Sequence, residues 1–291
     1  MTIEIILFII GIIGLLIALI SDIKTTEIPD YSNYFLIFSG FSLRLIHSLI
    51  TKDWNFTLIA LKTFPIILAL AFFMYYTKQW GGGDAKLLMG LGIIFATYPS
   101  FLQNIFHPKI LFLQFPFVLF LNILLIGIVY SFLYSLVLVI KNRKKFTTKL
   151  KERLSQNKNP QIALILTALI LIVTSKILNE EFISFLLLTI ALVSLFLFYF
   201  YFYIKTLEIV CLIHTVPVSK LIEGDWITHN VYFKHKLIHK SSQELTKKQI
   251  SLIKKTNIKN IEIKEGIVFS PVFLISVIIS LIFGNIFLYV I

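Results

Sequence analysis

The sequence from residue 2 to residue 21 reads TIEIILFIIGIIGLLIALIS, and its only charged side chain is that of Glu4. An apolar run of this length can cross a bilayer as an α-helix, because a span needs about 20 residues at 1.5 Å per residue. No lysine or arginine precedes the run, which is unlike a secretory signal peptide. We therefore expect this segment to be a retained first transmembrane helix.

Seven further apolar runs follow along the chain. They cover residues 33–50, 56–76, 85–106, 110–140, 161–178, 182–204 and 267–290. The composition agrees with a membrane protein, since 57% of the residues are hydrophobic and 14% are charged, whereas a soluble domain carries roughly 25% charged residues. The sequence predicts an all-α fold, a polytopic helix bundle with about eight transmembrane helices.

Positive charge is concentrated in two segments between these runs. Residues 141–160 contain eight Lys or Arg and one acid, and residues 205–266 contain eleven Lys and six acids. Because positively charged loops stay on the cytoplasmic side, we expect both segments in the cytoplasm and both termini outside. The connections at 22–32 and 77–84 then also face the cytoplasm. We expect a multi-pass protein of the cytoplasmic membrane in contact with membrane lipids.

Two aspartates lie at the ends of spans that are far apart in the sequence. Asp22 follows the first run in SDIKTTEIPD (21–30), and Asp84 precedes the fourth run in WGGGDAK (80–86). The end of the first span and the start of the fourth lie on one side of the membrane in either orientation, so the two acids can meet. Two close carboxyl groups in a low dielectric share one proton, so one acts as a base while the other acts as an acid. Such a pair suits peptide hydrolysis, in which a base activates water and an acid polarises the carbonyl.

Residues near the two aspartates are candidates for substrate binding. Gly81, Gly82 and Gly83 can adopt positive φ and approach an extended substrate closely, and a glycine-rich edge can pair with an unwound strand. The charged candidates are Lys24, Glu27, Asp30 and Lys86. The two lysines either stabilise the ionised acids and position the substrate or extend to lipid headgroups. The two acids either attract a basic substrate segment or belong to a solvated loop.

Other polar residues suggest no further site. The single cysteine, Cys211, excludes an intrachain disulfide and a multi-cysteine zinc site. We interpret His229, His235 and His239 as solvated loop residues, and we expect no metal and no cofactor. Arg44 in the second span either pairs with an acid inside the bundle or lies near an interface. The basic segments lack interleaved stacking aromatics, so we expect no nucleic-acid partner.

The two aspartate segments together resemble a known family. GGGD at 81–84 matches the GxGD motif of membrane aspartic proteases, a group that includes prepilin peptidases, presenilin and signal peptide peptidase. DIKTTEIPD at 22–30 resembles the prepilin peptidase pattern Asp-x-Lys/Arg-x-x-x-Ile/Val-Pro-Asp/Asn, and Lys86 fits the GxGD-x-K form. The resemblance is strongest over residues 1–95. A weaker likeness to archaeal members runs through EGDW (223–226), residues 245–266 and FSPVFL (269–274).

This resemblance to the prepilin and preflagellin (type IV leader) peptidases implies a specific activity. Members cleave basic leader peptides from type IV pilin-like or archaellin precursors at the cytoplasmic membrane face, and the motif implies Asp22 and Asp84 as the catalytic pair. Bacterial members typically carry a zinc-binding tetracysteine segment and also N-methylate their product. With Cys211 as its one cysteine, this chain resembles the archaeal branch, and we expect a peptidase without methyltransferase activity.

Two other functions are compatible with parts of the pattern. The first is a GxGD peptidase that cuts within transmembrane segments. The second is a proton-coupled transporter that uses the two acids as a relay, although such proteins usually show inverted repeats and acids near the midplane. The double aspartate motif favours the leader peptidase.

The expected organisation has three parts. Residues 1–206 form the membrane bundle, with the catalytic core in the first four spans and a basic cytoplasmic loop at 141–160. Residues 207–266 form a small cytoplasmic α+β lobe, and residues 267–291 form the last transmembrane helix. Within the lobe, residues 245–257 predict a short helix with Thr246 and Gln249 as a capping box. Residues 258–266 alternate like a strand.

Overall fold

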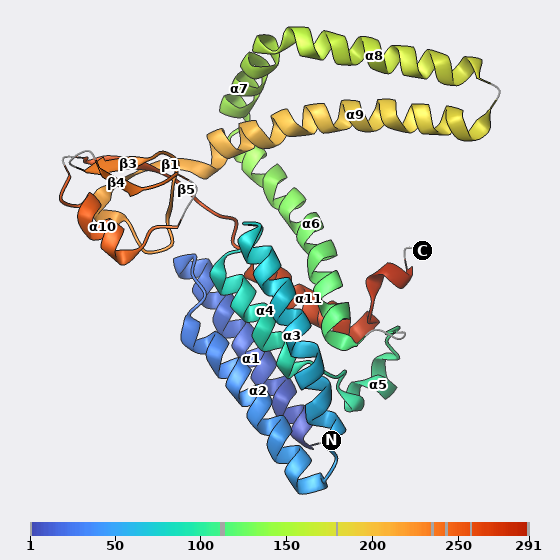
Figure 1. Cartoon of the computed structure of the whole chain (residues 1–291), viewed down its shortest axis with the longest axis vertical. Coiled ribbons are helices and arrows are strands. Elements are labelled where there is room, and N and C mark those ends of the chain that lie inside the picture. Colours follow the sequence, from blue (N-terminus) through green and yellow to red (C-terminus); the bar gives the residue numbers. More distant parts are fainter. Residues whose placement is uncertain are drawn as a thin grey trace. The chain divides into compact units, whose positions relative to one another are not determined.

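The computed structural model describes residues 2–110, 114–178, 180–233, 236–241, 244–256 and 258–289. The chain divides into two compact units, residues 1–132 with 267–291 and residues 133–266 (Figure 1). The first unit contains α1 (Thr2–Thr25), α2 (Asp30–Thr51), α3 (Asn55–Tyr76), α4 (Gly82–Ile94), α5 (Ser100–Phe106), the first part of α6 (Phe115–Lys141), α11 (Ser270–Phe283) and the 3₁₀ turn η3 (Ile286–Tyr289).

Membrane-length helices occur in both units. Among the described residues, six helices are long and apolar enough to cross a bilayer: α1, α2, α3, α6, α8 (Lys158–Ile177) and α9 (Glu181–Leu207), the last continuing to Leu212. The protein is therefore a multi-pass membrane protein. The expected helical bundle is confirmed.

Two of the eight predicted transmembrane helices, the fourth and the last, do not form single long helices in the structure. The fourth run divides into α4, which ends at Ile94, and α5, which begins at Ser100. Pro99 precedes α5 with an extended backbone, ψ 116°, and proline cannot continue a helix because it lacks an N–H group and its ring clashes with the preceding turn. The last run forms α11, which has only 14 residues. It ends at Phe283, and the φ of +74° at the following residue, Gly284, breaks the helix.

The helix α4 is enclosed by its neighbours in the first unit. Every residue from Leu87 to Ile94 is buried, and α4 packs against α1, α2 and α3. Small residues let α2 and α4 approach closely. A Cβ atom added to Gly40 of α2 would lie 2.7 Å from Ile93, and one added to Gly90 of α4 would lie 2.8 Å from the Cβ atom of Leu36.

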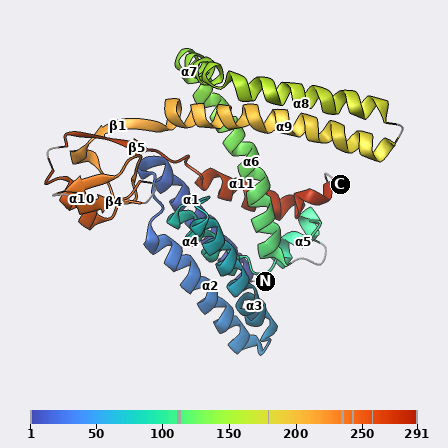
Figure 2. The ribbon, with the colours of Figure 1, turned by 45° about the horizontal axis from the view of Figure 1, so that its top comes forward.

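The second unit joins a helical part to a small lobe. Its elements are the end of α6, α7 (Arg143–Gln156), α8, α9, the π-helical turn η1 (Glu208–Leu212), β1 (Ile213–Pro217), η2 (Val218–Lys220), β2 (Trp226–Ile227), β3 (Val231–Phe233), β4 (Lys236–His239), α10 (Lys247–Ile253) and β5 (Asn260–Lys264). Figures 1 and 2 show α8 and α9 side by side as a helical hairpin. Most of the basic segment expected as a loop at 141–160 is instead the helix α7.

The lobe contains an antiparallel sheet of order β1-β5-β2 and a separate β3-β4 hairpin. The predicted capping box of α10 is confirmed: the backbone N–H of Gln249 donates to Thr246 Oγ1 at 3.3 Å, and the N–H of Thr246 donates to Gln249 Oε1 at 2.9 Å. The predicted strand is β5. The solvated environment expected for His239 is wrong, because its ring is fully buried. His229 is exposed, and His235 lies outside the described residues.

Candidate active site at the ends of α1 and α4

The first candidate aspartate, Asp22, lies inside a helix rather than in a loop. The helix α1 continues to Thr25, so Asp22 is about one turn before its end. Its carboxylate is buried, and Oδ2 accepts a hydrogen bond of 3.0 Å from the backbone N–H of Ser270. Ser270 is the first residue of α11, where helical N–H groups have no partner within the helix. The start of α11 therefore fixes the orientation of the Asp22 carboxylate.

The second candidate aspartate, Asp84, lies in the first turn of α4. Its Oδ2 atom accepts the backbone N–H of Gly81 at 3.3 Å, which is the half of a capping box that reaches back to the start of a helix. Its side chain is half-buried, and the next residue, Ala85, is buried. The carboxyl group of Asp84 is therefore held at the helix start by the glycine segment before it.

The fold brings the two helix ends that carry the aspartates to one side of the first unit. The helix α2 runs antiparallel to α1 after a connection of four residues, 26–29. It runs parallel to α4, because Asn33 near its start contacts Gly83 and Arg44 further along contacts Ile93. The end of α1 and the start of α4 consequently lie on the same side of the first unit, where Gly83 packs against Ile28 of the α1–α2 connection. Asp22 is near enough for its charge to act electrostatically on Asp84.

The three glycines contribute differently from the sequence-based expectation. Gly81 is extended, with φ −70° and ψ 163°, and the positive-φ glycines among the described residues are Gly224 and Gly284. The capacity of residues 81–83 for positive φ is therefore not used in this structure. Gly83 is needed for close packing, since an added Cβ would lie only 3.0 Å from the Cβ atom of Ile28. The absent side chain at residue 83 lets the start of α4 contact the α1–α2 connection.

The charged candidates divide into a pair and two exposed residues. Lys86 Nζ donates to Asp30 Oδ1 at 2.6 Å, and this contact ties the start of α2 to α4. Lys24 and Glu27 have exposed side chains. The backbone carbonyl of Glu27 accepts the hydroxyl of Ser21 at 2.9 Å, which fixes the turn between α1 and α2. In the described part of the chain, no three His, Cys, Asp or Glu side chains are grouped so that they could hold a metal ion.

Known proteins match the part of the chain that carries this site. Residues 9–132 match the model of the type IV leader peptidase family. This region is therefore similar to the type IV leader peptidase family. The matched region includes Asp22, Asp84 and the whole of α2, α3 and α4.

Curated relatives that the chain matches come from archaea. A preflagellin peptidase of Methanocaldococcus jannaschii is 32% identical over 150 residues, which cover 49% of this chain and 62% of that protein. A preflagellin peptidase of Methanococcus maripaludis is 31% identical over 141 residues, covering 46% of this chain and 58% of that protein. The prepilin peptidase EppA of Methanothermobacter thermautotrophicus is 26% identical over 199 residues, covering 66% of this chain and 51% of that protein. The matches thus span between 51% and 62% of these relatives' lengths.

Sequence analysis assigned no role to three residues that support the candidate site. Asn33 is fully buried, and its Nδ2 donates to the carbonyl of Gly83 at 3.2 Å. Trp80, directly before the glycines, is buried with its ring near those of Phe120, Phe269 and Phe273 at 5.5–6.1 Å. Ser270 reaches Asp22 from 248 residues away. Two of them carried a sequence signal: Trp80 lies next to the GGGD motif, and Ser270 lies in FSPVFL (269–274), which resembles archaeal members.

Proposed function

We propose that this chain is an aspartic endopeptidase that removes basic leader peptides from type IV pilin-like or archaellin precursors. The observation that carries the proposal is the placement of Asp22 near the end of α1 and of Asp84 at the start of α4, two helix ends that lie side by side through Ile28 and Gly83. Both residues belong to the region, 9–132, that matches the type IV leader peptidase family. The names of the curated relatives, preflagellin peptidase and prepilin peptidase, support the substrate class.

In the proposed reaction, Asp22 and Asp84 share one proton. The ionised carboxylate takes a proton from a water molecule, and the water oxygen forms a bond to the scissile carbonyl carbon. The protonated partner donates its hydrogen bond to the carbonyl oxygen and so stabilises the tetrahedral intermediate. The C–N bond then breaks, the leaving amine takes a proton from the pair, and the pair returns to its starting state. No covalent intermediate forms.

Two backbone amides support this pair. The N–H of Ser270 holds Asp22 and the N–H of Gly81 holds Asp84, so both carboxyl groups are oriented before the substrate arrives. Preorganised groups of this kind lower the cost of reaching the transition state. Gly81 is exposed and has no side chain, so an unwound substrate strand can approach Asp84 closely at this position.

The proposed orientation has the dyad at the cytoplasmic face and both termini outside. The support is the charge of the basic segments, since residues 141–160 alone contain eight Lys or Arg and one acid. A precursor with a basic leader in the cytoplasm and an apolar helix in the bilayer presents its junction at this depth. Residues 207–266 then form the cytoplasmic accessory lobe.

The dyad is tested with the purified full chain and a precursor that has a basic leader before an apolar helix. Asp22→Asn and Asp84→Asn should each lower turnover by about 10²–10⁴-fold, because asparagine cannot exchange the proton. The matched control is Asp53→Asn, the same chemical change at an exposed position in the α2–α3 connection, which should keep wild-type turnover. Wild-type turnover by either dyad variant would rule out the aspartic mechanism.

The substrate class is tested by mapping the new N-terminus with mass spectrometry. We expect one cut, after a glycine or similarly small residue at the junction between leader and apolar helix. Moving that junction two helical turns deeper, roughly 11 Å, should abolish processing. Efficient cutting of the displaced junction would favour a peptidase that works within transmembrane segments.

A further inference from the structure

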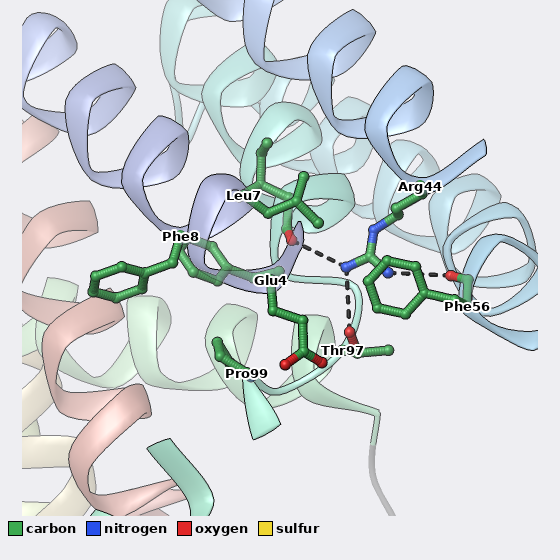
Figure 3. Close-up of a pocket in the computed structure, with 9 residues that line it drawn as sticks. Glu4, Leu7, Phe8, Arg44, Phe56, Thr97 and Pro99 are labelled. Carbon is green, nitrogen blue, oxygen red and sulfur yellow. Dashed lines mark hydrogen bonds between the residues drawn. The ribbon is translucent and has the colours of Figure 1, made fainter. Parts of the chain in front are cut away.

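Arg44 is a fully buried arginine in a membrane-length helix. Ionisable residues inside membrane spans are costly and are usually retained for a function. The guanidinium group of Arg44 lies over the ring of Phe56 at 4.3 Å and interacts electrostatically with Glu4. Its hydrogen bonds, however, go to neutral acceptors, several of which Figure 3 shows. The backbone carbonyls that Arg44 binds therefore explain why an arginine is buried at this position.

Arg44 caps the end of α4. Its Nε donates to the carbonyl of Ile93 at 2.9 Å, and its Nη2 donates to the carbonyl of Ile94 at 3.1 Å. These are the last two residues of α4, and the final carbonyls of a helix have no partner within it and favour a cation. Further bonds to Thr97 Oγ1 at 3.3 Å and to the carbonyl of Phe56 at 3.1 Å complete the site (Figure 3).

The other end of α4 is held from the same helix. Asn33 of α2 donates from Nδ2 to the carbonyl of Gly83 at 3.2 Å, and that carbonyl belongs to the peptide bond joined to Asp84. Asn33 and Arg44 are eleven residues apart, and so are Gly83 and Ile94. At 1.5 Å per residue, each spacing is about 16.5 Å. The two attachment points on α2 therefore match the two ends of α4.

We propose that Arg44 and Asn33 are positioning residues that fix α4 lengthwise along α2 and thereby keep Asp84 opposite Asp22. This inference rests on the proposed peptidase function. Asp22 is held independently by α11, so the relative depth of the two carboxyl groups depends on where α4 is fastened. That depth in turn determines which peptide bond of a membrane-anchored substrate reaches the pair. Arg44 thus affects the rate and position of cleavage without contacting the substrate.

The test compares Arg44→Gln with the matched control Ser48→Ala in the full chain. Ser48 is a buried polar residue on the same helix, but its hydroxyl pairs with Thr57 of α3 at 2.8 Å, so its loss leaves α4 attached. We expect Arg44→Gln to lower kcat by about 10- to 100-fold, as displacements of up to 1 Å do, with little change in KM and with secondary cuts near the normal junction. Arg44→Lys, which keeps a donor, should recover part of the rate. Ser48→Ala should keep the wild-type kcat and one cut.

A second readout does not depend on activity. In a Cys211→Ser background, Asp30→Cys and Lys86→Cys place thiols at positions whose native side chains touch at 2.6 Å, and a short bifunctional thiol reagent reports the alignment of α2 with α4. Arg44→Gln should lower the crosslinking yield, and Ser48→Ala should not. A wild-type chain that cleaves no precursor would overturn the peptidase proposal, while the crosslinking would still test the attachment.

Two results would overturn the inference. One is Arg44→Gln with wild-type kcat, cut position and crosslinking. The other is reduced crosslinking with an unchanged kcat, which would leave Arg44 as a purely structural cap. If Arg44→Gln does not fold, Asn33→Leu provides the same test at the other attachment point. This variant removes a side chain whose Oδ1 has no hydrogen-bond partner among the described residues.

Discussion

Replacing Gly83 with alanine should damage the protein in a way that replacing the neighbouring Gly82 does not. Gly82 and Gly83 are the first two residues of α4, and Asp84 follows them directly. An added Cβ at Gly83 would lie 3.0 Å from the Cβ atom of Ile28, whereas one at Gly82 would lie 3.6 Å from a ring carbon of Tyr75. The first distance is shorter than an ordinary contact, and the second is ordinary.

The size of the effect follows from which atom is crowded. Contacts become ordinary near 3.4 Å, so the start of α4 and Ile28 must separate by about 0.4 Å. A side-chain rotation cannot supply this separation because the Cβ atom of Ile28 is bonded to the backbone. Overpacking costs about 1–3 kcal/mol, and the better helix propensity of alanine returns about 1 kcal/mol. We expect Gly83→Ala to lose about 0–2 kcal/mol and Gly82→Ala to gain up to about 1 kcal/mol.

The assay combines denaturation in mixed micelles with the cleavage reaction. Because the shift moves Asp84 relative to Asp22, we expect the kcat of Gly83→Ala to fall by about tenfold, as misplacement of less than 1 Å allows. The activity of Gly82→Ala also reports on substrate binding, so stability is the cleaner comparison for that variant. Equal stability and equal kcat for the two variants would refute the packing role assigned to Gly83.

Two further predictions concern the charged pair beside the dyad and the buried histidine of the lobe. The Asp30–Lys86 ion pair is partly exposed, so Asp30→Asn should lower stability by about 0.2–1 kcal/mol at low salt, with the difference disappearing at high salt; a loss that persists at high salt would contradict this. Burial lowers the pKa of His239 below its ordinary value of 6.5. Below a pH of about 6.5 the unfolded lobe therefore binds more protons than the folded lobe. The free energy of unfolding of the lobe should consequently decrease as the pH decreases in that range. Amide hydrogen exchange in β4 and α10 measures this, and a His239→Gln variant with the same pH slope as wild type would show that another group is responsible.

Local patterns were sufficient for several elements of the fold. The apolar runs predicted the six long helices because a span must be apolar over about 20 residues. The Thr246–Gln249 capping box was predicted correctly because both partners lie within one helical turn. The placement of the end of α1 and the start of α4 on one side followed from counting membrane crossings, which needs no knowledge of packing. The resemblance in the two aspartate segments likewise lies in residues that are close together in the sequence.

Only the tertiary structure decided how the candidate site is built. The fourth apolar run breaks after Ile94, where Arg44 from another helix binds the carbonyls that a continuous span would have used internally. Ser270 reaches Asp22 across 248 residues, and no periodicity in the sequence connects them. Gly83 is required by the nearness of Ile28 and not by its own backbone angles. In each case the deciding contact joins segments that are distant in the chain. Sequence patterns describe residues that are close together in the chain. They therefore predict the helices but not the contacts that hold Asp22 and Asp84 in place.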